Sequence, residues 1–485
     1  MRFYSVQKFL LLNYGVGEML NFNFCVRIFV VIVPLLVQNG DTSNLPRQAL
    51  PPMGREMRAE FLHAADYTPL NHGAYGTFPR RVQTALRQVQ ERIESNADLW
   101  IRIDARIEMD KVRAQIASLL KADASDIVVV PNTTSGMNAI LRSMIWQRGD
   151  KIMHFSTVYG AMKSLIQYVC DTSNGTVTSI EMPVTYPITN AALMAQFEAF
   201  VTANHNPASG SRIRLALFDH VTSVPHVINL IQAFTSYLKE RGILTLIDGA
   251  HAVGQVEIDL ATVKPDYYIT NAHKWFYAAR SGALLYVDKV RQATIHPAII
   301  SSNYDKNGGR FQDEFFWTGT IDYSPYITIP AALAFRAELG GEAVIRNYTH
   351  ALAKEGGAYL AGRFRTRILQ EDEQMGSCVD VQLPIQVYDH PLIVPGWFDE
   401  ELIKKRNLFT GVYQHGGAWW IRVSTQIYNS IEDFHRAGDV FTEICDELNA
   451  HTGSSGGSAG KAGWIVHGGA ATWGYLKWKA NNGDL

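Results

Sequence analysis

Two stretches decide the fold: Ile243–Gly254 (ILTLIDGAHAVG) and Asp266–Trp275 (DYYITNAHKW). Each is a short apolar run, rich in β-branched or aromatic residues, that ends abruptly in polar side chains, as a buried strand does. In an open α/β sheet, ligands bind at the carboxyl ends of the strands. We therefore expect one site to be formed by the titratable groups that follow the two runs: Asp248, His251, His273 and Lys274.

A carboxylate, two imidazoles and a lysine at one sheet edge match the needs of pyridoxal 5′-phosphate (PLP) chemistry. The lysine forms a Schiff base with the cofactor aldehyde, and the carboxylate keeps the pyridine nitrogen protonated so that the ring withdraws electrons. Asp248 is the candidate carboxylate, because a charge at the end of an apolar strand is costly unless it is paired. Lys274 is the candidate for the Schiff base and for moving protons at the substrate α-carbon; the alternative is a surface lysine.

The spacing of Asp248–His251 and Asn271–Lys274 resembles that of the class V aminotransferase superfamily of fold type I PLP enzymes, and within it the isopenicillin N epimerase-like branch. Three further motifs carry the resemblance, which spans roughly residues 67 to 448: Leu70–Gly76 (LNHGAYG), Trp317–Asp322 (WTGTID) and Ile421–Asn429 (IRVSTQIYN). The resemblance implies an α/β fold with a large domain built on a mainly parallel seven-stranded sheet and a smaller C-terminal α+β domain. It also implies a homodimer with shared active sites.

Alternating strand and helix patterns between Ile127 and Lys274 independently predict a mainly parallel sheet. We divide the chain into an N-terminal extension (1–55), a large PLP-binding domain (56–325), a small domain (326–450) and a tail (451–485). The tail opens with a Gly/Ser-rich linker composition, and we expect it to be disordered.

A phosphate site is predicted after the strand Ile127–Pro131. The turn Asn132–Asn138 is rich in hydroxyls and glycine and precedes a helix that we expect over Ala139–Trp146. Free N–H groups and the positive end of a helix attract a phosphate, although helix capping uses the same residue types. The resemblance assigns the phosphate to Thr134, with Thr133 and Ser135 beside it.

The resemblance implies further cofactor contacts. Tyr159 would stack on the pyridine ring, His251 would contact the ring or its 3′-oxygen, and Asn271 and His273 would bind the phosphate. Ser223 falls near the 3′-hydroxyl at a position where many relatives carry Asn. Thr320 would reach the phosphate of the other subunit. The alternatives are a core or surface tyrosine, a core histidine and, for Thr320, a simple helix-entry loop.

Arg422 lies between apolar neighbours on the strand predicted at Trp419–Ser424. A buried arginine requires a carboxylate partner. The resemblance implies the substrate α-carboxylate, and an internal salt bridge is the alternative. Asn71 and His72, in the glycine-rich turn, are the other substrate-binding candidates.

The step after removal of the α-proton decides the reaction. Reprotonation on the other face gives an epimer, loss of a β-sulfur group gives a lyase, and protonation at the cofactor carbon gives an aminotransferase. A cysteine desulfurase needs a mobile nucleophilic cysteine, and Cys378 instead begins a predicted strand. A non-catalytic binding protein with this fold is the remaining alternative.

Composition narrows the partners and the location. The 485 residues are 47% hydrophobic, and 44 Lys and Arg oppose 46 Asp and Glu, so neither nucleic acid nor an acidic membrane is the expected partner. Four widely spaced cysteines predict neither a metal site nor a disulfide framework. An apolar run, Ile28–Val37, makes a signal or anchor within residues 19–40 possible, but its length and flanks favour a cytoplasmic enzyme.

Overall fold

The computed structural model describes residues 49–307 and 309–451. Every element below belongs to one compact unit that begins at Leu50. Most of the predicted N-terminal extension, including residues 19–40, and nearly all of the predicted tail lie outside the described residues. None of the helices in the described ranges is long and apolar enough to cross a membrane.

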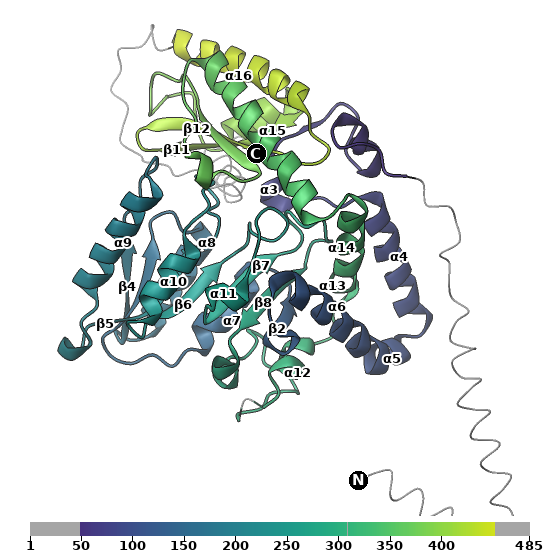
Figure 1. Cartoon of the computed structure of the whole chain (residues 1–485), viewed down its shortest axis with the longest axis vertical. Coiled ribbons are helices and arrows are strands. Elements are labelled where there is room, and N and C mark those ends of the chain that lie inside the picture. The colour runs from purple at the N-terminus through teal and green to yellow at the C-terminus, as the bar shows by residue number, and fades with distance from the viewer. Residues whose placement is uncertain (1–48, 308, 452–485) are drawn as a thin grey trace, which may run out of the picture. The chain divides into compact units, whose positions relative to one another are not determined.

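A seven-stranded sheet has the order β2–β8–β7–β6–β5–β3–β4 (Figure 1). β8 is antiparallel to both of its neighbours, and the other neighbouring pairs are parallel. This confirms the predicted mainly parallel sheet. The strands are β2 (Ile127–Val130), β3 (Asp150–Phe155), β4 (Val177–Met182), β5 (Arg212–Asp219), β6 (Leu244–Asp248), β7 (Tyr267–Asn271) and β8 (Ala283–Val287).

Both faces of this sheet are covered by helices, which is why β2, β6, β7 and β8 are buried at every position rather than alternating between buried and exposed. Along β2, Ile127 and Val129 enter one core, and Val128 and Val130 enter the other. The first core takes residues from α4 (Arg80–Ser95), α6 (Ala105–Leu120), α9 (Asn190–Asn204), α10 (Ile231–Lys239), α11 (Leu260–Val263), α13 (Ser324–Ile327) and α14 (Ile329–Glu338). The second takes residues from α7 (Thr133–Ser143), α8 (Gly160–Thr172) and α12 (Phe311–Phe316).

The helix predicted over Ala139–Trp146 has the wrong bounds, because α7 begins six residues earlier, at Thr133, and ends at Ser143. The side chain of Asn132 accepts the N–H of Ser135 at 2.8 Å and so caps a helix that starts directly after the strand. The predicted phosphate-binding residues therefore form the first turn of α7 rather than a loop before it.

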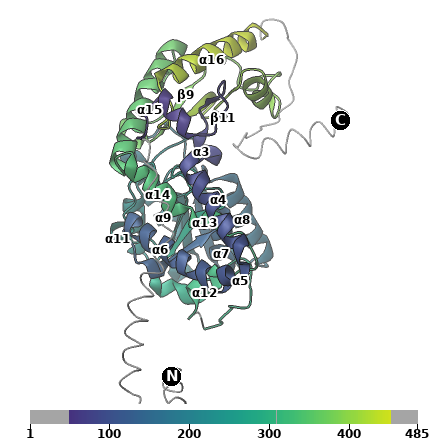
Figure 2. The same ribbon diagram turned by 90° about the vertical axis from the view of Figure 1, so that its right-hand side faces the viewer.

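A smaller antiparallel sheet, β11–β12–β9, is packed against α15 and α16, which lie side by side (Figure 2). In β12, Trp419, Ile421 and Val423 face these helices, whereas Trp420 joins the core of the large sheet. Arg422 alternates with Ile421 and Val423, so it lies on the side of Trp420. The bounds are β9 (Cys378–Gln382), β11 (Gly411–His415), β12 (Ala418–Ser424), α15 (Glu342–Phe364) and α16 (Ile431–His451).

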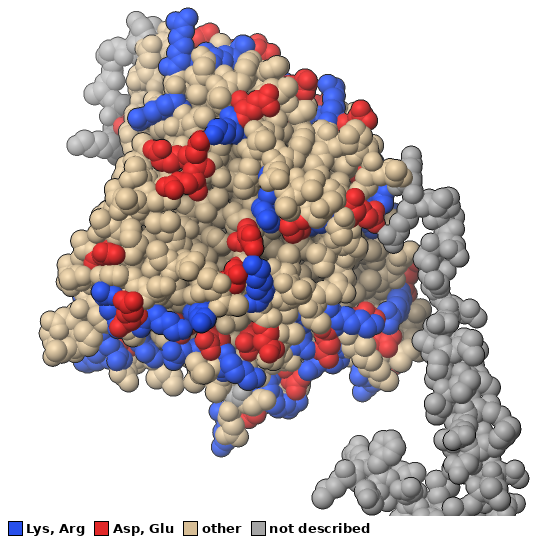
Figure 3. Space-filling view, in the orientation of Figure 1, with Lys and Arg blue, Asp and Glu red and all other residues tan. Residues whose placement is uncertain are grey.

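A short parallel pair, β1 (Thr68–Pro69) with β10 (Leu408–Phe409), joins the start of the folded chain to its C-terminal part. The short helices α3 (His72–Tyr75) and α5 (Ala97–Leu99) complete the fold. On the face drawn in Figure 3, basic and acidic side chains are interspersed, so that face has no extended basic surface.

Candidate active site

Three polar residues end three adjacent parallel strands: Asp219 on β5, Asp248 on β6 and Asn271 on β7. Asp219 is the register partner of Asp248, and Asp248 is the partner of Ile269, two residues before Asn271. Because side chains alternate along strands, all three point to the face covered by α7 and α8. All three are buried, so they form one polar floor at the carboxyl edge.

Lys274 follows β7 at this edge, and its Nζ lies 2.9 Å from Nε2 of His251. The indole Nε1–H of Trp275 points to Nδ1 of His251 at 3.3 Å. An indole only donates, so Nδ1 accepts and the neutral imidazole carries its proton on Nε2, facing the lysine. Loss of surrounding water, with help from Arg422, lowers the pKa of Lys274 to about 8. The neutral amine that acts as a nucleophile or base is therefore reached at a lower pH than in an ordinary lysine.

The backbone around Lys274 is held by distant residues. His72 Nε2 lies 2.6 Å from the Lys274 carbonyl, and His72 Nδ1 lies 2.7 Å from the Tyr428 hydroxyl. A carbonyl only accepts, so His72 donates through Nε2 and accepts the Tyr428 O–H through Nδ1. Arg336 donates to the Trp275 carbonyl at 2.9 Å. His72, expected to bind substrate, therefore has both nitrogens engaged by the protein.

A glycine is required where the turn Leu70–Gly76 packs against the backbone next to Lys274. Gly76 has φ +63°, and a Cβ there would lie 1.7 Å from the His273 carbonyl oxygen. The turn Leu70–Gly76 can approach the lysine turn this closely only without a side chain at that position. This explains why the glycine-rich motif and the lysine motif occur together.

The first turn of α7 fits an anionic group. Asn271 Oδ1 accepts the N–H of Thr133 at 3.0 Å, which joins the helix start to the end of β7. Thr133 Oγ1 is buried and has no hydrogen-bond partner among the described residues. Thr134 is exposed beside it. A helix N-terminus with an unpaired buried hydroxyl is suited to a phosphate oxygen.

Arg422 is buried, and its guanidinium is held by neutral groups only. It donates to Asn71 Oδ1 and to the Ser223 carbonyl, each at 2.8 Å. Its Nε is buried without a partner, and no acidic side chain in the described part of the chain forms an ion pair with it. Asp380, its register partner on β9, also forms none. Burial raises the pKa of Asp380 and the charge of Arg422 opposes this rise, so the two groups interact, but no carboxylate of the described residues makes a direct ion pair with the guanidinium. A buried cation without a direct ionic partner is costly, and a ligand carboxylate can supply that partner.

The remaining predicted cofactor-binding residues, Tyr159, His273 and Thr320, lie in three different surroundings. Tyr159 precedes α8, and burial, then Tyr75 and Asp248, raise its pKa, so it shares the surroundings of the strand ends. His273 Nδ1 donates to the Gly282 carbonyl at 3.3 Å, and burial lowers its pKa to about 4. Thr320 is exposed in the turn that follows Gly319.

The sequence interpretation missed Asp219 and Trp275 as parts of the site. Asp219 ends an apolar strand just as Asp248 does, and that signal could have found it. The bond from Trp275 to His251 depends on the turn geometry after β7, which the sequence does not reveal.

No thiol is available at the site among the described cysteines. Cys378 is fully buried, its Sγ lies 3.2 Å from Ser424 Oγ, and burial raises its pKa to about 12. Burial also raises the pKa of Cys445 to about 12 and that of Cys170 above its usual value. Cys25 lies outside the described residues.

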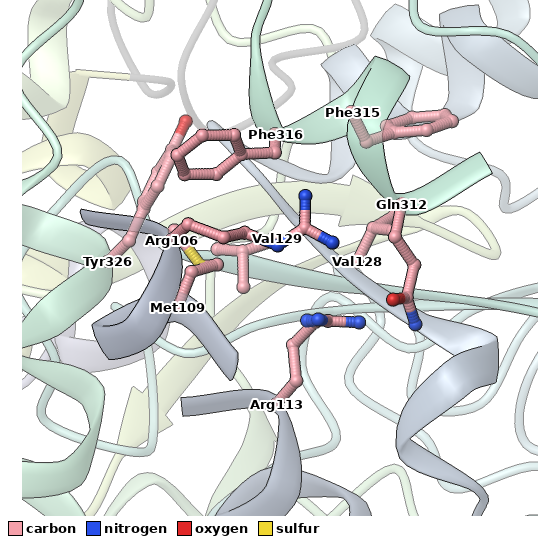
Figure 4. Close-up of a pocket in the computed structure, with 9 residues that line it drawn as sticks. All are labelled: Arg106, Met109, Arg113, Val128, Val129, Gln312, Phe315, Phe316 and Tyr326. Atoms are coloured by element: carbon pink, nitrogen blue, oxygen red, sulfur yellow. The ribbon is translucent and has the colours of Figure 1, made fainter. Parts of the chain in front are cut away.

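A hollow lined mainly by residues of α6, β2 and α12 is too small to be a substrate site (Figure 4). Arg106 and Arg113 extend into it beneath Phe316, but its volume of about 10 Å³ has room for roughly one water. The described ranges contain no group of three or more His, Cys, Asp or Glu side chains placed to hold a metal ion.

Known proteins are similar to this chain in sequence and in fold. The profile of the family "Aminotransferase class-V" matches residues 76–390. The L-cysteine desulfhydrase-like protein lolT1 of Epichloe uncinata is 30% identical over 443 residues, covering 82% of this chain and 97% of that protein. Isopenicillin N epimerase of Streptomyces clavuligerus is 24% identical, covering 81% and 98%. The solved cystine C–S lyase C-DES shares the fold, with a TM-score of 0.65 at 18% identity over 78% of this chain and 98% of that one.

These matches confirm the family, the fold and the cofactor that the motifs predicted. The chain belongs to the class V aminotransferase family and is a PLP-dependent enzyme that acts at the α-carbon of an amino acid or amino-acid conjugate.

Proposed function

We propose that the enzyme is a carbon–sulfur lyase that acts on L-cysteine or a cysteine S-conjugate. The observation that carries this choice is the inert state of Cys378. A desulfurase needs a protein thiolate to take the sulfur, whereas a lyase releases the sulfur directly. The name of the L-cysteine desulfhydrase-like relative supports the same choice.

PLP, when bound, supplies a ring that withdraws electrons from the substrate α-carbon. We assign its aldehyde to Lys274 and its ring nitrogen to Asp248, with Tyr159, His251 and Ser223 around the ring. The unpaired Thr133 hydroxyl supports a phosphate site at the start of α7. The residues assigned to the phosphate are Thr133, Thr134, Ser135, Asn271 and His273.

Arg422 is assigned to the substrate α-carboxylate, with Asn71 and Ser223 fixing its guanidinium. The neutral Lys274 amine then accepts the α-proton. The Cβ–S bond breaks, and its electron pair leaves with the sulfur as sulfide or a thiolate. Water converts the remaining three-carbon fragment to pyruvate and ammonia.

His72 is assigned a positioning role in place of the substrate-binding role expected from the sequence, because both of its nitrogens bind the protein. Replacing His72 by Phe removes its bond to the Lys274 carbonyl. We expect a lower kcat with little change in KM, and a shifted absorption band of the bound cofactor. Tyr428→Phe removes only the outer bond and should have a smaller effect. An unchanged band and kcat in His72→Phe would contradict this role.

The products test the reaction. The purified enzyme is incubated with L-cysteine or S-conjugates, and sulfide or thiol, pyruvate, alanine and the D-epimer are measured, with Lys274→Ala as control. Equimolar thiol and pyruvate are expected. Alanine with a protein persulfide would instead identify a desulfurase. A D-amino acid without thiol release would identify an epimerase.

We also propose a homodimer in which Thr320 of one subunit completes the other site. Thr320 is next to the exposed Ile321, and the turn is bonded through Trp317 to Ser301, which follows the exposed Ile299 and Ile300. Exposed aliphatic residues gathered at one place mark an interaction surface. Mixing refolded Lys274→Ala with Thr320→Val should restore activity toward about a quarter of wild type if the sites are shared. Light scattering that shows a monomer would rule this out.

A further inference from the structure

Two carboxyl groups lie side by side at the polar floor. Asp219 and Asp248 are register partners on adjacent strands, and each is 3% exposed. Asp248 Oδ1 accepts the N–H of Ala250 at 2.9 Å, whereas Asp219 Oδ2 is buried and has no hydrogen-bond partner among the described residues. Neither carboxyl forms an ion pair with a described Lys or Arg. The two acids therefore share one buried environment, and Asp219 keeps a buried oxygen without a partner in the described part of the chain.

We propose that Asp219 is a second acidic group of the cofactor pocket, a neutral carboxylic acid that donates a hydrogen bond to an oxygen anion there while Asp248 remains ionised. Two neighbouring buried carboxylates cannot both carry a charge cheaply, so the one whose buried oxygen has no partner among the described residues keeps the proton. The acceptor is either the Asp248 carboxylate or an oxygen of the bound cofactor. The second of these rests on the cofactor placement proposed above.

The charges around Asp219 agree with this assignment. Burial first, and then the charge of Asp248, hold the pKa of Asp219 well above its usual range, against the opposing effects of its own backbone N–H and of Lys274. Burial also raises the pKa of Asp248, but the Ala250 N–H and Lys274 favour its ionised form. Tyr186 is the other titratable group affected by Asp219, and its own raised pKa keeps it neutral.

A neutral acid beside Asp248 has a consequence for the cofactor. The ring nitrogen then meets a single negative charge, because Asp219 adds a donor and no second charge. An asparagine can replace such an acid, since its amide is also a neutral donor of similar size. Leucine keeps the bulk and removes the donor.

Cofactor titration tests this. Asp219→Asn, Asp219→Leu and Asp248→Asn are stripped of cofactor, and PLP is added back while the visible band is recorded. We expect Asp219→Asn to bind within about threefold of wild type and Asp219→Leu to bind about tenfold or more weakly. Weakening of Asp219→Asn to the level of Asp248→Asn would show that Asp219 is an anion and overturn the proposal. Wild-type binding by Asp219→Leu would show that the bound cofactor receives no hydrogen bond from Asp219 and would rule out the cofactor oxygen as the acceptor.

Thermal unfolding of the apoenzyme supplies a test that does not depend on PLP. An acid with a raised pKa in the folded state stabilises the fold fully below its unfolded pKa of 3.8, and this contribution is lost as the pH rises above that value. Asp219→Asn lacks this loss, so its Tm should exceed that of wild type at pH 8, and the gap should close toward pH 4. A lower Tm for Asp219→Asn at pH 8 would overturn the neutral-acid assignment even if PLP binds as proposed.

A rise in apoenzyme Tm with no change in cofactor binding by either variant would assign the donor to Asp248 alone. That result would rule out a cofactor oxygen as the acceptor of the Asp219 hydrogen bond. Weaker binding by Asp219→Leu together with the rise for Asp219→Asn supports the donor in the loaded enzyme. Circular dichroism and gel filtration of each variant establish that it is folded before either result is interpreted.

Discussion

Lys274, after β7 of the large sheet, and Cys378, at the start of β9 of the small sheet, are two potential nucleophiles that loss of water affects in opposite ways. For the lysine it lowers the pKa to about 8, and for the cysteine it raises the pKa to about 12. In both cases the charged form is disfavoured. The neutral amine is the reactive form of a lysine, whereas the neutral thiol is the unreactive form of a cysteine.

Burial thus selects the chemistry at both places, because it disfavours the charged form of each side chain. A turn bonded to His72 and Arg336 holds Lys274 at the sheet edge, beside His251. Cys378 lies within the small sheet, against Ser424. This difference supports the proposal that Lys274 moves the proton at the α-carbon and that Cys378 does not accept the sulfur.

Removing Lys274 should have the largest effect. Lys274→Ala eliminates both the covalent link to the cofactor and the base, so we expect product formation to fall by at least about three orders of magnitude. The visible band of the bound cofactor should be lost or shifted. Lys239→Ala, an exposed helix position, is the matched control and should retain both. Comparable activity in the two variants would remove Lys274 from the mechanism.

Arg422 comes next in magnitude. Arg422→Gln leaves the substrate carboxylate without its charged partner, so KM for L-cysteine should rise about 30-fold or more. Arg422→Lys keeps the charge but loses the planar fork and should be intermediate. Cysteamine, which lacks the carboxylate, is the control substrate and should be affected little by either change. An equal loss with cysteamine would mean that Arg422 is structural.

The pH dependence of Lys274 is a smaller but more direct test. In the apoenzyme the neutral fraction of Lys274 should rise through pH 8, well below the ordinary 10.5. Between these values the unfolded state binds more protons, so stability should rise with pH by up to about 1.4 kcal/mol per unit, and Lys274→Met should lack this slope. Acetylation at a series of pH values, followed by peptide mass spectrometry, measures the midpoint. A midpoint near the ordinary 10.5 would contradict it.

The sequence predicted the features that local pattern determines. Apolar runs ending in Asp248 and Lys274 located the sheet edge, because a strand that is buried on both faces leaves its polar residues at its end. The strand Trp419–Ser424 likewise placed Arg422 on β12, and the structure contains no internal salt bridge for it among the described residues. The antiparallel direction of β8 has no such local signal, because strand direction depends on how the chain crosses the sheet.

Contacts between distant segments could not be predicted in this way. His72 and Lys274 are 202 positions apart, and tertiary packing such as that of Gly76 against His273 brings them together. The start of α7 was missed because Asn132 was counted as part of a loop, although its side chain caps the helix. The pair of Asp219 with Asp248 depends on strand register, which local sequence does not determine.

Cys378→Ser should have the smallest effect and sharpens the comparison with Lys274. Sulfide release should stay within about twofold of wild type, because a thiol with a pKa of about 12 takes no part in the reaction. The buried change should lower stability by about 1 kcal/mol. Native-state alkylation provides the matching chemical test: the half-buried Cys170 should react before Cys378. If Cys378→Ser stopped sulfur release while the spectrum of the bound cofactor stayed intact, the sulfur would have to pass through this thiol, and the lyase assignment would give way to a desulfurase.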